Sequence, residues 1–142
     1  MKQFVYICLA VGGLLPLSVQ GQVFTPKVKT YVREGNKAYE EKSYVDAEVS
    51  YKKALEEEEE NFAARFNLGN THYQRKNYDK AIEEYKKASV MAGEPSDQAL
   101  AYHNLGNSFL EKKDYKKAIS AFKDALKRNP NDADTRYNLA YA

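Results

Sequence analysis

The chain has 142 residues, 22 basic and 20 acidic, and a formal net charge of +2. This near balance does not favour nucleic acid as a partner, because phosphate binding depends on clustered lysine and arginine and here the two signs alternate along the sequence. One cysteine and two histidines provide no ligand set for a metal, so we expect no metal site and no cofactor.

The first 21 residues have the pattern of a secretory signal peptide. An apolar stretch follows Lys2 and ends at Leu17, and small or tolerated residues come after it. The stretch is shorter than the roughly 20 apolar residues that a membrane-spanning helix needs, although an uncleaved N-terminal anchor is an alternative. We therefore expect residues 1–21 to be removed together with Cys8, residues 22–27 to form a lead-in, and the mature chain not to insert in a membrane.

From residue 28 onward a skeleton of small and aromatic residues recurs three times, with glycines 34 and then 37 residues apart. The three copies are Gly35, Tyr44, Ala47, Tyr51, Ala54; Gly69, Tyr78, Ala81, Tyr85, Ala88; and Gly106, Tyr115, Ala118, Phe122, Ala125. Such a period is typical of helical hairpins that stack because none can bury its apolar face alone. Within each copy the alanines and the aromatic residue share one helical face, and we expect each glycine to permit a close approach between helices.

Helix boundaries are also indicated. Ser43 followed by Asp46 is a capping box, and Asn77 and Asp114 are N-cap candidates at the equivalent points of the next two copies. The 93–96 segment, rich in glycine and proline, contains the three residues that lengthen the last spacing. We expect these residues to lengthen a loop, with a local change in the pitch of the stack as the alternative.

These residues resemble the tetratricopeptide repeat, whose first helix reads W-x-x-L-G-x-x-Y and whose second reads A-x-x-x-F-x-x-A before a proline. The third copy matches best, from Leu105 and Gly106 to Phe122 and Pro130. The departures are Tyr31, Arg65, Tyr102 and Arg136 at the tryptophan position, and Lys42, Lys76 and Lys113 at the turn glycine. The resemblance implies an all-α, right-handed solenoid with full repeats at 28–61, 62–98 and 99–132 and a partial fourth at 133–142.

In proteins that this chain resembles, the first helices of the repeats line a concave groove that binds partners. The resemblance therefore implies a partner-binding surface rich in amide and aromatic side chains. Its residues are Asn36, Phe66, Asn67, Asn70, Tyr73, His103, Asn104, Asn107, Tyr137 and Asn138. The asparagines can bind the main chain of an extended peptide, because each amide both donates and accepts; alternatively, they stabilise adjacent helices.

One specialised function of the family is not implied. Members that grip a terminal carboxylate use cations at groove positions that are held here by Val32, Leu100 and Asn104. The chain also contains no catalytic motif, and we expect it not to be an enzyme. His72 is expected to be a core residue, whereas the run of glutamates at 56–60 is either a solvated helix end or a docking patch for a basic partner or divalent cations.

A narrower resemblance depends on three runs, at 35–39, 65–70 and 135–140, together with the signal peptide. These features are similar to the repeat proteins of the Bacteroides aerotolerance operons, which are encoded beside von Willebrand A domain membrane proteins. The resemblance implies a periplasmic or cell-envelope protein of a Gram-negative bacterium. It also implies protein or peptide partners, among them von Willebrand A domain proteins, in a stress-tolerance assembly.

The sequence ends inside the first helix of a fourth repeat. There Tyr137, Leu139 and Ala140 have no second helix to cover them. An uncovered apolar face invites association, so the expectation is either a segment of a longer product, for which this is an accessory repeat domain, or a structural repeat protein that self-associates into a homo-oligomer.

Overall fold

The structure, a computed structural model, describes residues 26–142. In this part of the chain the secondary structure consists of seven α-helices and no strand. They are α1 (Pro26–Glu40), α2 (Tyr44–Glu57), α3 (Phe62–Gln74), α4 (Tyr78–Met91), α5 (Pro95–Glu111), α6 (Tyr115–Arg128) and α7 (Ala133–Tyr141). The predicted signal peptide and Cys8 lie outside the described residues, as does most of the predicted lead-in.

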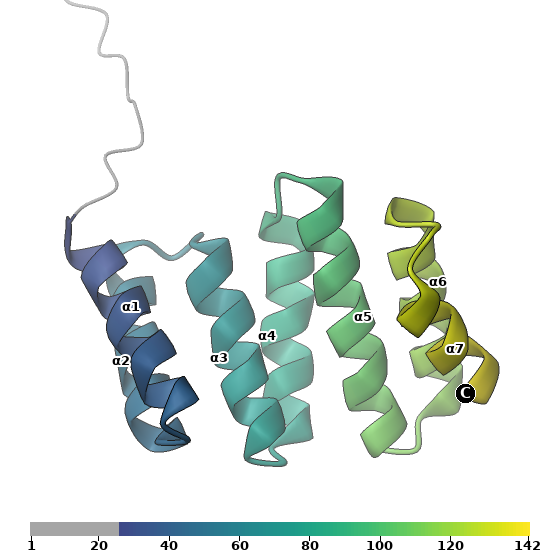
Figure 1. Cartoon of the computed structure of the whole chain (residues 1–142), viewed down its shortest axis with the longest axis horizontal. Helices are drawn as coiled ribbons and strands as arrows, with labels where there is room; N and C mark the ends of the chain where they lie inside the picture. Colours follow the sequence, from purple (N-terminus) through teal and green to yellow (C-terminus); the bar gives the residue numbers. More distant parts are fainter. Residues whose placement is uncertain (1–25) are drawn as a thin grey trace, which may run out of the picture.

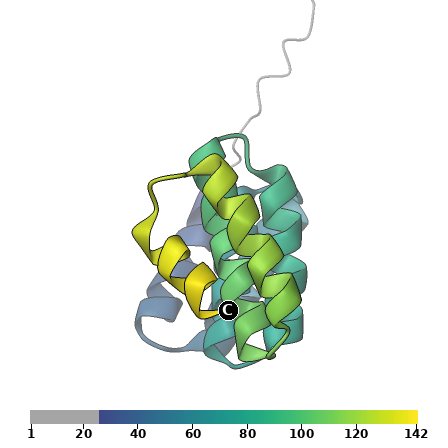
Figure 2. The same ribbon diagram turned by 90° about the vertical axis from the view of Figure 1, so that its right-hand side faces the viewer.

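The helices form two layers. Figure 1 shows α1, α3, α5 and α7 in the nearer layer and α2, α4 and α6 behind them. Figure 2, seen from the C-terminal end, shows α7 beside α6 at the end of the stack. Consecutive helices pair as hairpins, so the prediction of an all-α stack with three full repeats and the start of a fourth is confirmed.

The recurring glycines do permit the close approach that their spacing predicted. A Cβ atom added to Gly35 would lie 2.5 Å from a ring carbon of Tyr51, and one added to Gly69 would lie 2.7 Å from a ring carbon of Tyr85. Both rings are only 1% exposed and have no room to move away. Gly106 has the same relation to a phenylalanine of α6. Each repeat is therefore closed by an aromatic ring that packs on glycine backbone.

The turns between paired helices use a backbone conformation that favours glycine. Lys42, Lys76 and Lys113 each have a φ of 60°, in the left-handed region, which costs a residue with a side chain roughly 1–2 kcal/mol. At the helix starts that follow, the side chain of Asp114 accepts from the backbone N–H of Lys117, so this predicted N-cap is confirmed.

The other two predicted N-caps differ from expectation. Ser43 and Asn77 occupy N-cap positions, but neither side chain accepts a backbone N–H. Instead, the hydroxyl of Ser43 donates to the carboxylate of Asp46 at 2.7 Å, and the backbone N–H of Ser43 donates to the carbonyl oxygen of Ala38 at 2.8 Å. The two side chains are bonded to each other, and neither of the reciprocal bonds of a capping box is formed.

The three additional residues of the second, 37-residue glycine spacing lie in a helix. The loop before α5 spans only residues 92–94, and α5 begins at Pro95 and has 17 residues, against 15 in α1 and 13 in α3. Proline at the first helical position is already set to helical φ and needs no N–H partner, so the chain continues as helix there. Figure 1 shows α5 extending beyond its neighbours at this end. The expected longer loop is therefore wrong.

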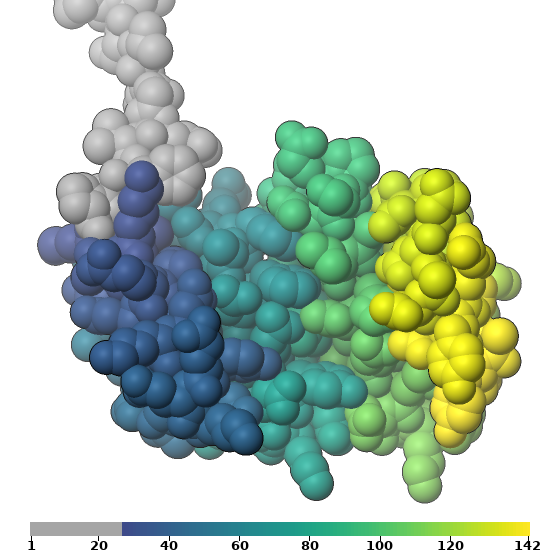
Figure 3. Space-filling model, viewed as in Figure 1, coloured from purple at the N-terminus to yellow at the C-terminus, as the bar shows by residue number. Residues whose placement is uncertain are grey.

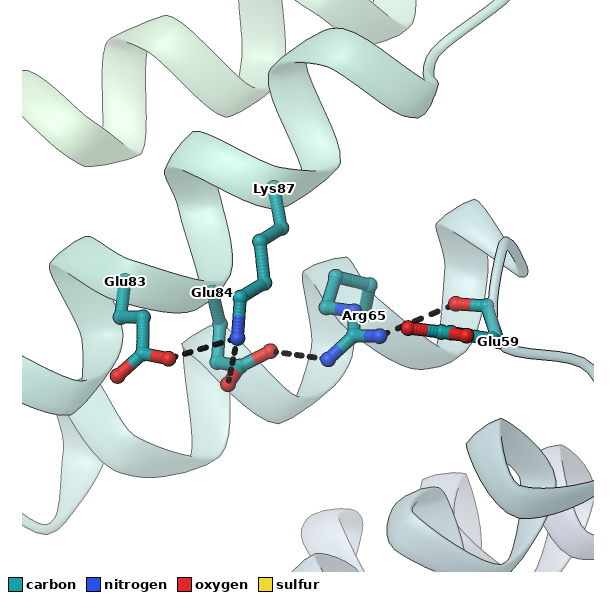
Figure 4. A network of polar contacts seen from close by, with 5 residues as sticks. All are labelled: Glu59, Arg65, Glu83, Glu84 and Lys87. Carbon is teal, nitrogen blue, oxygen red and sulfur yellow. Dashed lines mark hydrogen bonds and ion pairs between the residues drawn. The ribbon is translucent and has the colours of Figure 1, made fainter.

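A buried ion pair replaces the consensus tryptophan in the second repeat. Arg65 on α3 donates through Nη1 to the carboxylate of Glu84 on α4 at 3.0 Å and through Nη2 to the carbonyl oxygen of Glu59 at 3.1 Å. Figure 4 shows this guanidinium between its two acceptors, with Lys87 on the far side of the carboxylate. The pair joins both helices of the repeat to the loop before them.

His72 lies in the core, as predicted. Its side chain comes from α3, is only 3% exposed, and its Nδ1 atom has no hydrogen-bond partner in the described part of the chain. Burial lowers the pKa of this imidazole, so the ring is neutral at pH 7. A neutral ring is compatible with the packed interior, and His72 takes no part in the groove.

Candidate functional site

Three adjacent hollows follow one another along the face formed by α1, α3 and α5, which faces the viewer in Figure 3. Each has a volume of about 280 to 320 Å³. The apolar hollow is lined by Val28, Lys29, Val32, Arg33, Asn36, Asn61 and Ala63. The Asn36 hollow is lined by Asn36, Tyr39, Glu40, Tyr51, Asn67 and Asn70. The tyrosine hollow is lined by Tyr39, Asn70, Tyr73, Gln74, Tyr85, Asn104 and Asn107. Shared residues connect them into one groove.

The six predicted asparagines form a ladder of hydrogen bonds along this groove. In each step, an amide nitrogen from one repeat donates to the amide oxygen of the repeat before it. The bonds join Asn67 to Asn36 at 3.0 Å, Asn104 to Asn70 at 3.1 Å, and Asn138 to Asn107 at 2.9 Å. Since every step crosses from one repeat to the next, the ladder sets the spacing of the groove helices.

Tyrosine hydroxyls from the second helices complete the ladder. Tyr51 donates to Asn36 Oδ1 at 2.8 Å, and Tyr85 donates to Asn70 Oδ1 at 2.7 Å. In the third repeat the equivalent residue is Phe122, which has no hydroxyl, so Asn107 Oδ1 accepts only the amide of Asn138. The first two oxygens therefore receive two donors each, and their capacity is used by the fold.

Other ladder atoms remain available to a ligand. Within the described residues, Nδ2 of Asn36 and Oδ1 of Asn104 make no hydrogen bond, and the same holds for Nδ2 of Asn107 and Oδ1 of Asn138. The structure thus shows the asparagines stabilising adjacent helices, and partner binding by them stays a prediction. The inner amide atoms hold the repeats together, while the remaining donors and acceptors can pair with an extended main chain.

The predicted aromatic anchors lie in different surroundings. Tyr73 is half-buried in the tyrosine hollow, and its hydroxyl donates to Glu111 at 3.4 Å. Phe66 stacks on Phe62 with ring centroids 5.5 Å apart and packs on Tyr85, so most of its surface is used by the fold and it lines none of the three hollows. Tyrosine is thus the principal aromatic residue of the groove.

His103 links α5 to α7. Its Nδ1 lies 2.6 Å from the hydroxyl oxygen of Thr135, which in turn donates to the carboxylate of Asp132 at 2.6 Å. Because the threonine hydrogen is given to the carboxylate, the imidazole donates through Nδ1. Burial lowers the pKa of His103, so the ring is neutral at pH 7. This histidine holds the last helix in place, and one of its nitrogens is occupied.

The hollows are also lined by two tyrosines of the second helices, which were not among the expected groove residues. Tyr51 and Tyr85 belong to second helices, yet they reach the groove through the space beside the repeat glycines. The signal was present in the sequence, because both are tyrosines where the consensus has phenylalanine. A hydroxyl retained at a buried position needs an acceptor, and the groove asparagines provide it.

Family members that grip a terminal carboxylate hold cations at three groove positions. In this chain the same three positions hold uncharged residues. Val32 lines the apolar hollow, Leu100 is 50% exposed on α5, and Asn104 is part of the ladder. None of these side chains attracts a carboxylate. None of the three supplies the positive charge with which such members bind a terminal carboxylate.

One face of the last helix, α7, is left exposed. Tyr137 is 73% and Tyr141 is 74% exposed, four residues apart on one face of α7. Leu139, which was expected to be uncovered, packs against the core cluster that includes Leu105 and Phe109. The uncovered face is therefore tyrosine-rich, because the leucine points back into the stack.

Within the described residues, no group of three or more histidine, cysteine, aspartate or glutamate side chains could hold a metal ion. No helix in this part of the chain is long and apolar enough to cross a membrane. The glutamate run at 56–60 contains the end of α2 and the turn after it. Glu58 accepts from Asn61 at 3.2 Å and the carbonyl of Glu59 accepts from Arg65, so part of the run stabilises this turn.

Comparison with solved structures identifies many similar folds. The first TPR of Spaghetti (RPAP3), bound to the HSP90 peptide SRMEEVD, matches with a TM-score of 0.75 and 19% identity over 81% of this chain and 89% of that one. The N-terminal domain of stress-induced protein-1 (STI-1) from C. elegans matches with 0.74 and 22% over 82% and 97%. The MamA protein matches with 0.74 and 28% over 81% and 61%.

Comparison with curated protein sequences found no match. The family model for the tetratricopeptide repeat matches residues 59–131, just over half of the chain. The helical hairpins, the glycine and aromatic closure of each repeat, and the groove along the first helices agree with that match. Domains of this kind are typically non-catalytic interaction modules. The chain belongs to the tetratricopeptide repeat family.

Proposed function

We propose that this protein is an exported scaffold that binds extended segments of partner proteins in the groove formed by α1, α3, α5 and α7. The observation that carries the proposal is the row of three connected hollows, because side chains of successive residues of an extended peptide can enter them in turn. Among the residues whose amides keep an unpaired atom, Asn36, Asn104 and Asn107 line these hollows, where that atom can pair with a peptide main chain.

The apolar hollow adds an anchor at the first repeat. Val28 and Val32 form its floor with Ala63, and an apolar side chain placed there would be removed from water. Burying a side chain of that size contributes roughly 1.5–3 kcal/mol. Micromolar binding corresponds to about 8 kcal/mol, so this anchor supplies a part of it and contacts in the other hollows must supply the rest.

The related structures support a peptide as the ligand. The residues of this groove favour a peptide whose chemistry differs from that of the HSP90 peptide. The RPAP3 domain is bound to the HSP90 peptide SRMEEVD, which ends in acidic residues and a carboxylate. In this chain Val32, Leu100 and Asn104 replace the cations that such an end requires. We therefore propose an internal segment of the partner, with no requirement for its terminus.

The cellular setting of the proposal comes from the sequence. The signal peptide pattern at residues 1–21 supports export to the periplasm or cell envelope of a Gram-negative bacterium. The resemblance to repeat proteins of aerotolerance operons supports an assembly for stress tolerance, with von Willebrand A domain proteins as partners. The groove would then hold a segment of such an envelope protein.

The test blocks the groove without disturbing the ladder. Ala63 is exposed at the second position of α3 and lines the apolar hollow, so Ala63→Glu fills that hollow and places a favourable charge near a helix N-terminus. Ser96→Glu is the matched control, because Ser96 is exposed at the second position of α5 and lines none of the three hollows.

Affinity capture from envelope extract, with bound proteins identified by mass spectrometry, compares the parent with these two variants. The expected result is a specific set of envelope proteins that binds the parent and Ser96→Glu and is lost with Ala63→Glu. Capture of the same proteins by all three would place binding outside the groove and contradict the proposal.

A second candidate function is self-association through the uncovered face of α7. The observation that favours it is the pair of exposed tyrosines, Tyr137 and Tyr141, on one face of the helix. Sedimentation equilibrium over a hundredfold range of protein concentration would detect it. A mass that rises with concentration in the parent, and that stays monomeric when both tyrosines are replaced by serine, would establish this function.

A further inference from the structure

The tyrosine hollow has walls suited to a positively charged side chain. Rings of Tyr39, Tyr73 and Tyr85 line it, and the amides of Gln74 and Asn104 supply oxygen atoms beside them. Aromatic faces carry negative electrostatic potential and attract a cation within about 6 Å of the ring centroid. The combination of rings and amide acceptors is the one that a guanidinium group fits best, because it is flat and has five N–H donors.

Two carboxylates stand at the same edge of the groove. Glu40 is the last residue of α1 and lines the neighbouring Asn36 hollow, and Glu111 is the last residue of α5 and accepts from the hydroxyl of Tyr73. Both glutamates are exposed, and within residues 26–142 neither forms an ion pair with a lysine or arginine.

Lys42 and Lys113, each two residues beyond one of the glutamates, form no ion pair with them within residues 26–142, and three further cations near them have other partners. Lys112, beside Glu111, pairs with Asp79, and Lys37 pairs with Glu41 at 3.9 Å. Arg75, which follows the last residue of α3, pairs with Glu48. The carboxylates at the groove edge are thus left for a cation that comes from outside the chain.

The helix ends strengthen this attraction. α1, α3 and α5 all end at this edge of the groove, at Glu40, Gln74 and Glu111, and each helix C-terminus carries a partial negative charge. A glutamate at such an end is mildly unfavourable for the isolated helix. Such a glutamate stands at two of the three helix ends beside the aromatic hollow.

The tyrosines remain neutral in this potential. Burial, together with the charge of Glu111, raises the pKa of Tyr73 to about 12, and burial with the proximity of Tyr39 and Glu40 raises the pKa of Tyr51 to about 12. Their rings therefore keep the hydroxyl proton at pH 7, and the carboxylate that contacts the tyrosine hollow is that of Glu111.

We propose that the tyrosine hollow binds an arginine side chain of the partner segment, with the guanidinium beside the rings of Tyr39 and Tyr73 and paired with Glu111, while Glu40 adds a second negative charge at the neighbouring hollow. This inference rests on the proposed function of the groove. It makes the groove selective along its length, because the apolar hollow at the other end is bordered by Lys29 and Arg33 and disfavours a second basic residue. The ligand is an extended segment with an apolar residue at one end and an arginine toward the other.

Peptide pools of defined composition test this inference with the protein expressed from the full sequence. Each pool contains N-acetylated, C-amidated undecapeptides with random residues around a central position that is arginine, citrulline or glutamate. Citrulline has the shape of arginine without its charge. Binding of labelled protein to the immobilised pools should be about five- to tenfold stronger for arginine than for citrulline and weakest for glutamate.

The double variant Glu40→Gln, Glu111→Gln should bring the ratio of arginine to citrulline binding close to 1. The matched control is Glu56→Gln, Glu60→Gln, which removes two exposed charges outside the groove and should leave the ratio unchanged. The urea midpoint of each variant, compared with that of the parent, verifies that the fold is retained.

The outcomes separate the inference from the function on which it rests. Equal binding of the arginine and citrulline pools, abolished by Ala63→Glu, would overturn the arginine site and leave the groove as the binding surface. A preference for arginine that persists in the double variant would also overturn it. Failure of every pool to bind would contradict the groove function itself.

Discussion

Replacing Asn70 by alanine should cost about 1 kcal/mol more in unfolding free energy than replacing Asn107. The two residues occupy the same position in successive repeats, and each accepts one amide bond from the repeat that follows. The loss of that bond and the gain in helix propensity, roughly 0.5 kcal/mol, are common to both variants. Asn70 makes two further bonds: its Oδ1 accepts the hydroxyl of Tyr85 at 2.7 Å, and its Nδ2 donates to Oδ1 of Asn67 at 3.4 Å. The first contributes about 0.5–1.5 kcal/mol as a net hydrogen bond, and the second is at the outer limit of hydrogen-bond length and adds little.

Urea unfolding followed by circular dichroism measures this difference, and Tyr85→Phe completes a double-mutant cycle. Tyr85→Phe removes the hydroxyl and retains the ring that packs on Gly69. Asn70→Ala and Tyr85→Phe should therefore couple by about 1 kcal/mol, and the additional cost of Asn70→Ala should disappear in the phenylalanine background. Equal costs for Asn70→Ala and Asn107→Ala in the parent would refute the role of the ladder in stability.

Three further predictions concern stability. Lys113→Gly should stabilise the protein by roughly 0.5–1 kcal/mol in thermal unfolding, because it relieves a left-handed backbone, whereas Lys113→Ala removes the same charge and should not stabilise it. Arg65→Leu should cost about 3 kcal/mol of unfolding free energy in urea, because it leaves Glu84 buried without its arginine partner. Adding Glu84→Leu should recover most of the lost stability. A double variant as unstable as the single one would contradict the pairing. Burial lowers the pKa of His72, so below about pH 6.5 the unfolded chain takes up a proton that the folded chain does not, and stability falls as the pH decreases. His72→Phe should reduce that slope between pH 7.5 and pH 5.5, and an unchanged slope would assign the pH dependence to other groups.

The features that the sequence predicted correctly are those that repeat. Gly35, Gly69 and Gly106 lie at the same position of each copy, and an aromatic residue follows each at a constant distance of 16 residues. A glycine inside a helix costs about 1 kcal/mol relative to alanine, so its recurrence requires a packing reason. That reason, a ring against the backbone, is the contact that the structure shows.

The features that the sequence did not predict depend on contacts between particular side chains. Arg65 and Glu84 are 19 residues apart, and no local rule predicts that their helices bring them to 3.0 Å. The start of α5 at Pro95 is a second example, because proline is equally typical of a loop and of a first helical turn. The orientation of each asparagine amide in the ladder likewise follows from its neighbours in the next repeat and in the second helix.

The ladder also bears on how tightly the groove can bind. A peptide that binds a flexible surface must immobilise side chains and segments of that surface, and this ordering reduces its affinity. The cost in binding free energy is about 0.5–1.5 kcal/mol for each freely rotating side chain. Here the inner amide atoms of Asn36 and Asn70 are already held by two donors each, and the groove helices are held at fixed spacing by the bonds between repeats. A ligand then meets a surface whose donors and acceptors are in place before it arrives. The third repeat, where phenylalanine replaces the tyrosine hydroxyl, is the least constrained part of this surface, so we expect the groove to adapt to its ligand there first.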